Sequence, residues 1–271
     1  MTDWQEWHGH YDDRGSSLSR RLSVVQQRLD ELVSGEVSVR RILSLCAGDG
    51  RDILPVLTRH PDEQRPEVAL VELDPALAAA AERRAADAGV AATVVVGDAG
   101  LATTWQGTVP VDLLMLCGIF GNISEADIRN TIDAACAMLQ PGGSVLWTRG
   151  YFTHEDLRPQ IRQWFSVAGF TESSFDSEPT GYGVGVHRLT SKTCAATVPA
   201  RLFSFIRFCQ LCSSLRRGAD GGGPCSDYLL KLFSPFLVHR RFGPPYTRRQ
   251  LATRQAAQIS CYATENGTIR L

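Results

Sequence analysis

Apolar residues in the first 189 positions form two kinds of pattern. Between Ser17 and Val33 they recur every three or four positions with charged residues between them, and this period predicts an amphipathic helix. Further along, short continuous apolar runs alternate with helical stretches, and each run predicts a buried strand. The expected strands are residues 39–45, 68–73, 93–96, 111–117 and 144–148.

Helical stretches separate these strands. The Ala-rich segment 75–88 is a good helix former. A helix from about Glu125 to Leu139 has Ser124 as a plausible N-cap and Pro141-Gly142-Gly143 as a sharp stop. The remaining expected elements are a helix over 155–168 and two pairing strands over 171–175 and 183–189. This alternation predicts an α/β fold with a parallel sheet covered on both faces, in which ligands bind at the carboxyl ends of the strands.

The first strand leads into a turn of small residues, Cys46 to Gly50, where the backbone must turn tightly and let a ligand approach. Glu72 ends the next strand, 24 residues after Gly48. A spacing of about 20 residues is expected for a carboxylate that binds ribose hydroxyls. Asp98 ends the third strand and is positioned to meet the exocyclic amine of an adenine. A plain tight connection and a solvated strand-end carboxylate are the alternative interpretations.

Five motifs in order along the chain carry a family resemblance. They are Leu43–Asp52 (LSLCAGDGRD), Val71–Asp74 (VELD), Gly97–Ala99 (GDA), Val111–Gly118 (VDLLMLCG) and Pro141–Gly143 (PGG). With these motifs, residues 1–189 resemble a class I S-adenosylmethionine-dependent methyltransferase, from a group of bacterial methyltransferases without an assigned substrate. The resemblance implies a Rossmann-like, doubly wound, mostly parallel seven-stranded sheet with helices on both faces, an N-terminal helix and a basic C-terminal extension.

The resemblance also implies cofactor contacts. The first loop would pass beside the methionine part of the cofactor, Glu72 would bind the ribose and Asp98 the adenine. Two departures matter: Ser44 replaces the family's usual acidic residue and Cys46 its first loop glycine, so the amino-group end of the cofactor is expected to be held differently. The expected cofactor-binding residues are Ser44, Cys46, Ala47, Gly48, Asp49, Gly50, Glu72, Leu73, Asp98, Ala99, Cys117 and Gly118.

Methyl transfer is a displacement at a carbon already activated by positive sulfur, so the protein mainly aligns the nucleophile and excludes water. A general base is optional, and the candidates are His10, Tyr11 and His154. An ordinary surface or core role is the alternative for each of them. Asn122 is a further catalytic candidate that would orient an acceptor or a backbone carbonyl, and Phe120 would pack on the cofactor or in the core.

Charge divides the chain. Residues 1–189 hold 16 Arg and 26 acidic residues, a net charge of −10, whereas residues 190–271 carry +9. We expect an N-terminal helical segment over 1–38, the S-adenosylmethionine-binding domain over 39–189 and a basic, partly disordered extension over 190–271. The extension includes an expected amphipathic helix over 201–217 and suits weak contact with an anionic membrane surface or nucleic acid. Alternatively, the extension is not a domain that natural selection has maintained.

Several classes of protein are disfavoured. No apolar run is long enough to span a bilayer and no secretory signal is evident, so the expected location is the cytoplasm. Cys46, Cys117 and Cys136 are expected to be buried or free thiols. No metal site is expected, because the Cys209–Cys212 pair has no second close pair. A small-molecule acceptor is the expected partner.

Two rival functions remain. An NAD(P)-dependent oxidoreductase also uses a Gly-rich turn and a ribose carboxylate, although the absence of a full G-x-G-x-x-G, together with Asp98 and the PGG motif, disfavours it. A non-catalytic S-adenosylmethionine-binding module would explain the changes at Ser44 and Cys46.

Overall fold

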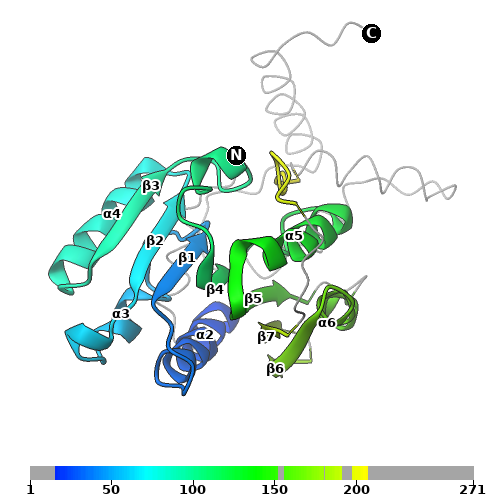
Figure 1. The fold of residues 1–271 in the computed structure, drawn as a ribbon, viewed down its shortest axis with the longest axis horizontal. Coiled ribbons are helices and arrows are strands. Elements are labelled where there is room, and N and C mark those ends of the chain that lie inside the picture. Colours follow the sequence, from blue (N-terminus) through cyan, green and yellow to red (C-terminus); the bar gives the residue numbers. More distant parts are fainter. Residues whose placement is uncertain (1–15, 152–155, 180, 191–196, 207–271) are drawn as a thin grey trace, which may run out of the picture. The chain divides into compact units, whose positions relative to one another are not determined.

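The computed structural model of the chain describes residues 16–151, 156–179, 181–190 and 197–206. All of them lie in the first of the two units into which the chain divides, Met1–Leu211. Their centre is a seven-stranded sheet with the order β3-β2-β1-β4-β5-β7-β6 (Figure 1).

The elements follow the alternation expected from the sequence. They are α2 (Ser17–Val33), β1 (Arg41–Leu45), α3 (Leu54–Leu57), η2 (Asp62–Gln64), β2 (Glu67–Glu72), α4 (Pro75–Asp87), β3 (Ala92–Val96), η3 (Ala102–Thr104), β4 (Val111–Leu116), α5 (Glu125–Met138), β5 (Leu139–Gly150), α6 (Arg158–Val167), β6 (Phe170–Ser177) and β7 (Tyr182–Leu189).

The sheet is mostly parallel. Strands β1 to β5 pair in parallel, and β7 runs antiparallel between β5 and β6. The predicted doubly wound, mostly parallel seven-stranded fold is therefore confirmed. The chain proceeds outward from β1 to β2 and β3, then returns to place β4 on the other side of β1. In open α/β sheets this reversal opens a crevice for ligands at the carboxyl ends of the strands.

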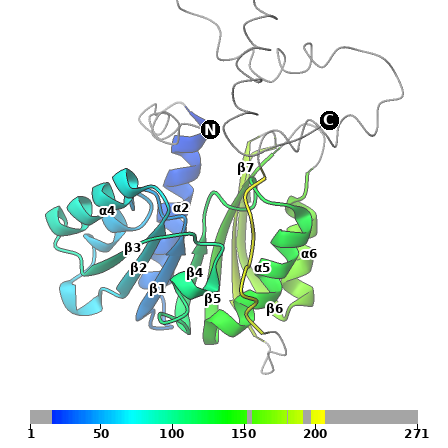
Figure 2. The same cartoon turned by 90° about the horizontal axis from the view of Figure 1, so that it is seen from above.

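Helices cover both faces, which explains why the strands are apolar throughout rather than alternating. On one face α2, α3 and α4 contribute Leu29, Leu54 and Ala81 to the core. On the other face α5 and α6 contribute Ile132 and Phe165. Figure 2 shows α4 and the α5–α6 pair on opposite sides of the sheet.

Local chemistry sets the helix starts. The Ser124 hydroxyl accepts a hydrogen bond from the Asp127 N–H at 3.1 Å, which confirms it as the N-cap of α5. The predicted stop at Pro141-Gly142-Gly143 is wrong in one respect: α5 ends at Met138, and β5 already begins at Leu139. Gly142 takes a positive φ of 81°, so the PGG segment bends within this longer strand.

Residues 197–206, which we call the strap, pack against this domain beyond the predicted boundary at residue 189. Isolated bridges join Arg201 to Leu101 and Phe205 to Ile123, so the start of the expected 201–217 helix is extended instead. Leu202 and Phe203 are each only 1% exposed within the core. The strap thus packs as part of the first unit of the chain.

Two further expectations concern cysteines and membranes. Cys46 and Cys117 are free thiols, whereas Cys136 is disulfide-bonded, which corrects the expectation for that residue. Among the described residues, none of the helices combines the length and the apolar character needed to cross a bilayer.

Candidate functional site

The loop after β1 turns tightly at the carboxyl edge of the sheet. Cys46, Gly48 and Gly50 have φ values of 56°, 57° and 71°, in the left-handed region that glycine enters freely and a cysteine only at a cost of about 1 kcal/mol. The Ala47 N–H donates to the Val71 carbonyl at 3.0 Å. The loop backbone therefore lies beside the end of β2.

Glu72 ties that loop to the next one. Its Oε2 accepts the Gly48 N–H at 2.8 Å, its Oε1 accepts the Asp74 N–H at 2.9 Å, and the residue is 9% exposed. Each carboxylate oxygen can still accept another hydrogen bond. The following Leu73 is 63% exposed, so an exposed apolar side chain lies next to a carboxylate that can accept further hydrogen bonds.

Asp98 lies after β3 in the same neighbourhood. Its Oδ1 accepts the Gly100 N–H at 2.8 Å, and its Oδ2 lies 3.0 Å from Nη1 of Arg201 in the strap. Burial raises the pKa of the Cys46 thiol, and the negative charges of Glu72 and Asp98 raise it further. The ends of β1, β2 and β3 thus bring the Glu72 and Asp98 carboxylates to the same edge of the sheet. Ala99, the neighbour of Asp98, is buried at 4% exposure.

Asp49 is engaged elsewhere. Its carboxylate pairs with Arg51 and with Arg84 of α4, each at 2.8 Å, and the residue is 5% exposed. This side chain therefore fastens the first loop to α4, and its predicted contact with the cofactor would have to come from its backbone.

A second polar group lies at the other end of the loop. Burial, with the charge of Asp49, raises the pKa of Asp52 to about 6. In the described part of the chain its buried Oδ1 has no hydrogen-bond partner, and neither has Oγ of Ser44, which is 1% exposed. Burial raises the pKa of Cys117, after β4, and the Asp52 charge adds to that effect. Asp52 was not assigned from the sequence, although it closes the first-loop motif.

The loop after β4 is held by polar contacts to its own backbone. The Gly118 N–H donates to Thr148 Oγ1 at 2.9 Å, and the Asn122 amide donates to the Gly118 carbonyl at 2.8 Å. Asn122 thus orients a backbone carbonyl, one of its two predicted roles. Phe120 is fully buried beside Trp147, so it packs in the core and not on a cofactor.

Buried Arg149, at the end of β5, donates to the Phe120 carbonyl. It was missed because an arginine inside an apolar strand has no distinguishing pattern. The predicted candidates His10, Tyr11 and His154 lie outside the described residues. Within the described ranges, no group of three or more His, Cys, Asp or Glu side chains could hold a metal ion.

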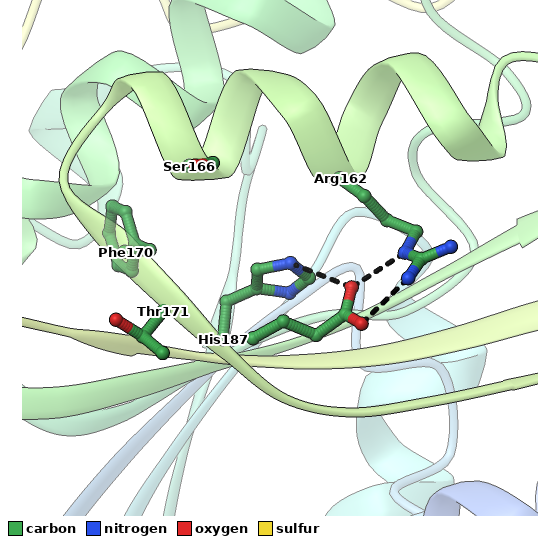
Figure 3. Close-up of a pocket in the computed structure, with 6 residues that line it drawn as sticks. Arg162, Ser166, Phe170, Thr171 and His187 are labelled. Atoms are coloured by element: carbon green, nitrogen blue, oxygen red, sulfur yellow. Dashed lines mark hydrogen bonds and ion pairs between the residues drawn. The ribbon is translucent and has the colours of Figure 1, made fainter.

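Two surface hollows lie away from this edge. One of about 350 Å³ is lined by Arg162, Glu172 and His187 (Figure 3). It lies on α6, β6 and β7, and β4 and β5 separate these two strands from β1 to β3 in the sheet. A second hollow, of about 320 Å³, is lined by Asp112 and neighbouring residues near the amino ends of β4 and β5. The candidate site is therefore defined by its strand-end chemistry and not by these hollows.

Known proteins are similar to this chain in part of its sequence and in its fold. Residues 42–143 match a family model described as a methyltransferase domain. No sequence among the curated proteins matches the chain. A solved O-methyltransferase family protein from Burkholderia thailandensis has a TM-score of 0.53 and 17% identity; the match covers 71% of this chain and 62% of that one. The chain thus spans less than two thirds of that relative.

Two further structures are similar. The 1,6-didemethyltoxoflavin-N1-methyltransferase of Burkholderia thailandensis, solved with its substrate and S-adenosylhomocysteine, has a TM-score of 0.54 and 16% identity over 70% of this chain and 85% of that one. The CurJ carbon methyltransferase has a TM-score of 0.54 and 17% identity over 70% of this chain and 59% of that one. At these identities the likeness establishes the fold.

Proposed function

We propose that this chain, whose residues 42–143 match a methyltransferase domain, is a class I S-adenosylmethionine-dependent methyltransferase and transfers the methyl group of S-adenosylmethionine to a small-molecule acceptor. The observation that carries the proposal is Glu72: a buried carboxylate at the topological switch point, bridging two loop backbones and still able to accept hydrogen bonds. This is the arrangement that two adjacent ribose hydroxyls need.

The residues around Glu72 fit the rest of the adenosine. The exposed side chain of Leu73 offers an apolar surface to the adenine ring. Asp98 offers a carboxylate to its exocyclic amine, and the left-handed loop from Cys46 to Gly50 lets the backbone approach the methionine part.

The amino-group end is assigned to Asp52. Position 44 holds a serine instead of an acid, and its buried hydroxyl has no partner in the described residues. Asp52 closes the first-loop motif and supplies a buried carboxylate oxygen that also has no partner there. An ammonium group would satisfy this oxygen, and a buried charge is stable only when it is paired.

Bound S-adenosylmethionine supplies an activated methyl group, so the protein's own task is positioning. Asn122 fixes the loop after β4, where the acceptor is expected, by holding the Gly118 carbonyl. His10, Tyr11 and His154 remain predicted general bases. A small-molecule acceptor is supported by the similar fold of the 1,6-didemethyltoxoflavin-N1-methyltransferase.

A thermal-shift experiment on the full chain with S-adenosylmethionine, S-adenosylhomocysteine, NAD and NADP tests the proposal. Ligand at 100 times its dissociation constant adds about 2.7 kcal/mol, on the order of 5 °C in Tm. We expect a shift with the two sulfur compounds only. A shift with NAD or NADP alone would favour the oxidoreductase alternative, and turnover with any acceptor would exclude a purely binding module.

The cytoplasmic location and a weak contact of residues 190–271 with anionic membranes or nucleic acid stay part of the proposal. Apart from the strap, this extension lies outside the described residues, and its charge of +9 is what supports such contacts. Binding of the full chain to anionic vesicles or to a DNA duplex, measured against salt concentration, would check them.

A further inference from the structure

Backbone hydrogen bonds fix the strap to two loops of the candidate site. The Leu202 N–H donates to the Gly100 carbonyl at 2.8 Å, just after β3, and the Ile206 N–H donates to the Asn122 carbonyl at 2.8 Å, after β4. The strap thus runs from the adenine side of the site to the loop where the acceptor is expected.

Burial fixes it as well. Leu202 and Phe203 are each 1% exposed and belong to the core that contains Trp105 and Ile128. The approach is so close that a β-carbon at Gly100 would collide with the Phe203 carbonyl. Because two buried apolar side chains outweigh any exposed polar contact, the strap stays in place when its surface side chains move.

Arg201 is the strap residue that reaches the site. Its Nη1 lies 3.0 Å from Oδ2 of Asp98, and the same nitrogen donates to the Phe203 carbonyl at 3.2 Å. The Arg201 and Asp98 side chains are 45% and 36% exposed. The strap's own backbone therefore aims the guanidinium at the carboxylate assigned to adenine, while the side chain keeps room to move.

We propose that Arg201 is a latch on the adenine end of the cofactor site. The guanidinium lies 3.0 Å from Asp98 Oδ2 and Oδ1 accepts the Gly100 N–H, so the adenine amine competes with the guanidinium for the charge and the remaining acceptor positions of this carboxylate. The inference rests on the proposed function, since it takes Asp98 as the adenine contact. It assigns the strap a role in regulating cofactor affinity.

The latch has two physical consequences. An exposed ion pair contributes little, so its removal strengthens cofactor binding only modestly. Salt screens the ion pair. The affinity of the wild-type chain for S-adenosylhomocysteine, which has no net charge, should therefore rise with ionic strength. This rise should disappear when Arg201 is replaced.

Titration calorimetry on the full chain tests the latch, with S-adenosylhomocysteine and with S-inosylhomocysteine, which carries a carbonyl in place of the adenine amine. The variants are Arg201→Ala and the control Arg188→Ala, an exposed arginine that donates to the Gly142 carbonyl near the amino ends of the strands. We expect Arg201→Ala to bind S-adenosylhomocysteine about two- to five-fold more tightly at low salt, with no change for the inosine compound or in Arg188→Ala.

Unchanged or weaker binding of S-adenosylhomocysteine to Arg201→Ala would overturn the latch while the proposed function stands. An equal gain for both compounds would also overturn it, because competition for Asp98 requires the amine. If neither the wild-type chain nor either variant bound S-adenosylhomocysteine, the latch and the proposed function would both fail.

Discussion

Two groups of ionisable side chains lie on different parts of the sheet and use their hydrogen-bonding capacity differently. At the carboxyl ends of β1 to β3, Glu72 accepts two backbone N–H groups and retains acceptor capacity, and Asp98 accepts one backbone N–H and pairs with Arg201 of the strap. At the other end of the sheet, Arg162 of α6 and Glu172 of β6 form a two-point ion pair at 2.6 and 2.8 Å, and Glu172 lies 3.5 Å from Nε2 of His187 on β7.

His187 completes the contrast. Its Nδ1 accepts the Trp147 Nε1–H at 3.1 Å, and its ring stacks on Phe165 at 4.4 Å between centroids. The cluster in Figure 3 therefore joins an Arg162–Glu172 ion pair to a histidine packed among aromatic rings, whose buried Nε2 has no hydrogen-bond partner in the described residues. The comparison teaches that the Glu172 carboxylate is already occupied by a cation, whereas the Glu72 carboxylate at the strand-end crevice keeps acceptor capacity for a ligand.

The largest expected effect comes from paired truncations of buried rings. Phe165→Ala on α6, beside His187, and Phe203→Ala in the strap should each lower the free energy of unfolding by about 3–5 kcal/mol, because each removes a fully buried ring. Only Phe203→Ala should also change the affinity of the folded protein for S-adenosylhomocysteine. Denaturant unfolding and calorimetry measure the two properties. If Phe165→Ala also altered the affinity for S-adenosylhomocysteine, the strap and the cluster around His187 would not differ in their effect on the cofactor site.

Acid should lower the free energy of unfolding through His187. Burial lowers the pKa of His187 to about 4, so its neutral form contributes stability that is fully present above pH 6.5 and is lost as the pH falls toward 4. The loss is at most about 3 kcal/mol. His187→Gln keeps an acceptor for Trp147 and should flatten this part of the pH profile of unfolding. An unchanged slope in the variant would contradict the assignment.

Asp52 should show the opposite sign. Its folded pKa of about 6 exceeds the ordinary value of 3.8, so stability is present below pH 3.8 and lost as the pH rises through 6. Asp52→Asn should therefore be more stable than wild type above pH 6, by at most about 3 kcal/mol, and equally stable near pH 4.

The same variant should bind S-adenosylhomocysteine about ten-fold more weakly, since an ammonium loses its charged partner. Binding of 5′-methylthioadenosine, which lacks the amino-acid part, should not change. Equal weakening for both ligands would place Asp52 outside the amino-group end.

The smallest effect is expected at the Arg162–Glu172 pair. Glu172→Gln should lower the free energy of unfolding by less than about 1 kcal/mol, because both side chains are partly exposed, at 41% and 31%. Cofactor binding should be unaffected. A clear loss of S-adenosylhomocysteine affinity would show that the hollow in Figure 3 takes part in function.

The sequence predicted the sheet and the adenosine end well because both depend on local patterns: apolar runs make the strands, and Gly48, Gly50 and Glu72 follow directly from strand ends. It failed where distant residues meet. The strap packs through a few apolar side chains, chiefly Leu202 and Phe203, which give no periodic signal. The pairing of Asp49 with Arg84 becomes visible only when α4 is placed against the first loop.

The central claim is that Glu72 binds the ribose of S-adenosylmethionine, and calorimetric titration of Glu72→Gln with that cofactor tests it most directly. Glu67→Gln, an exposed acid at the amino end of the same strand, is the matched control, and thermal melts verify folding. The account predicts about 100-fold weaker binding for Glu72→Gln, because charge-assisted hydrogen bonds to hydroxyls are lost, and wild-type affinity for Glu67→Gln. Equal affinity in all three folded proteins would contradict it.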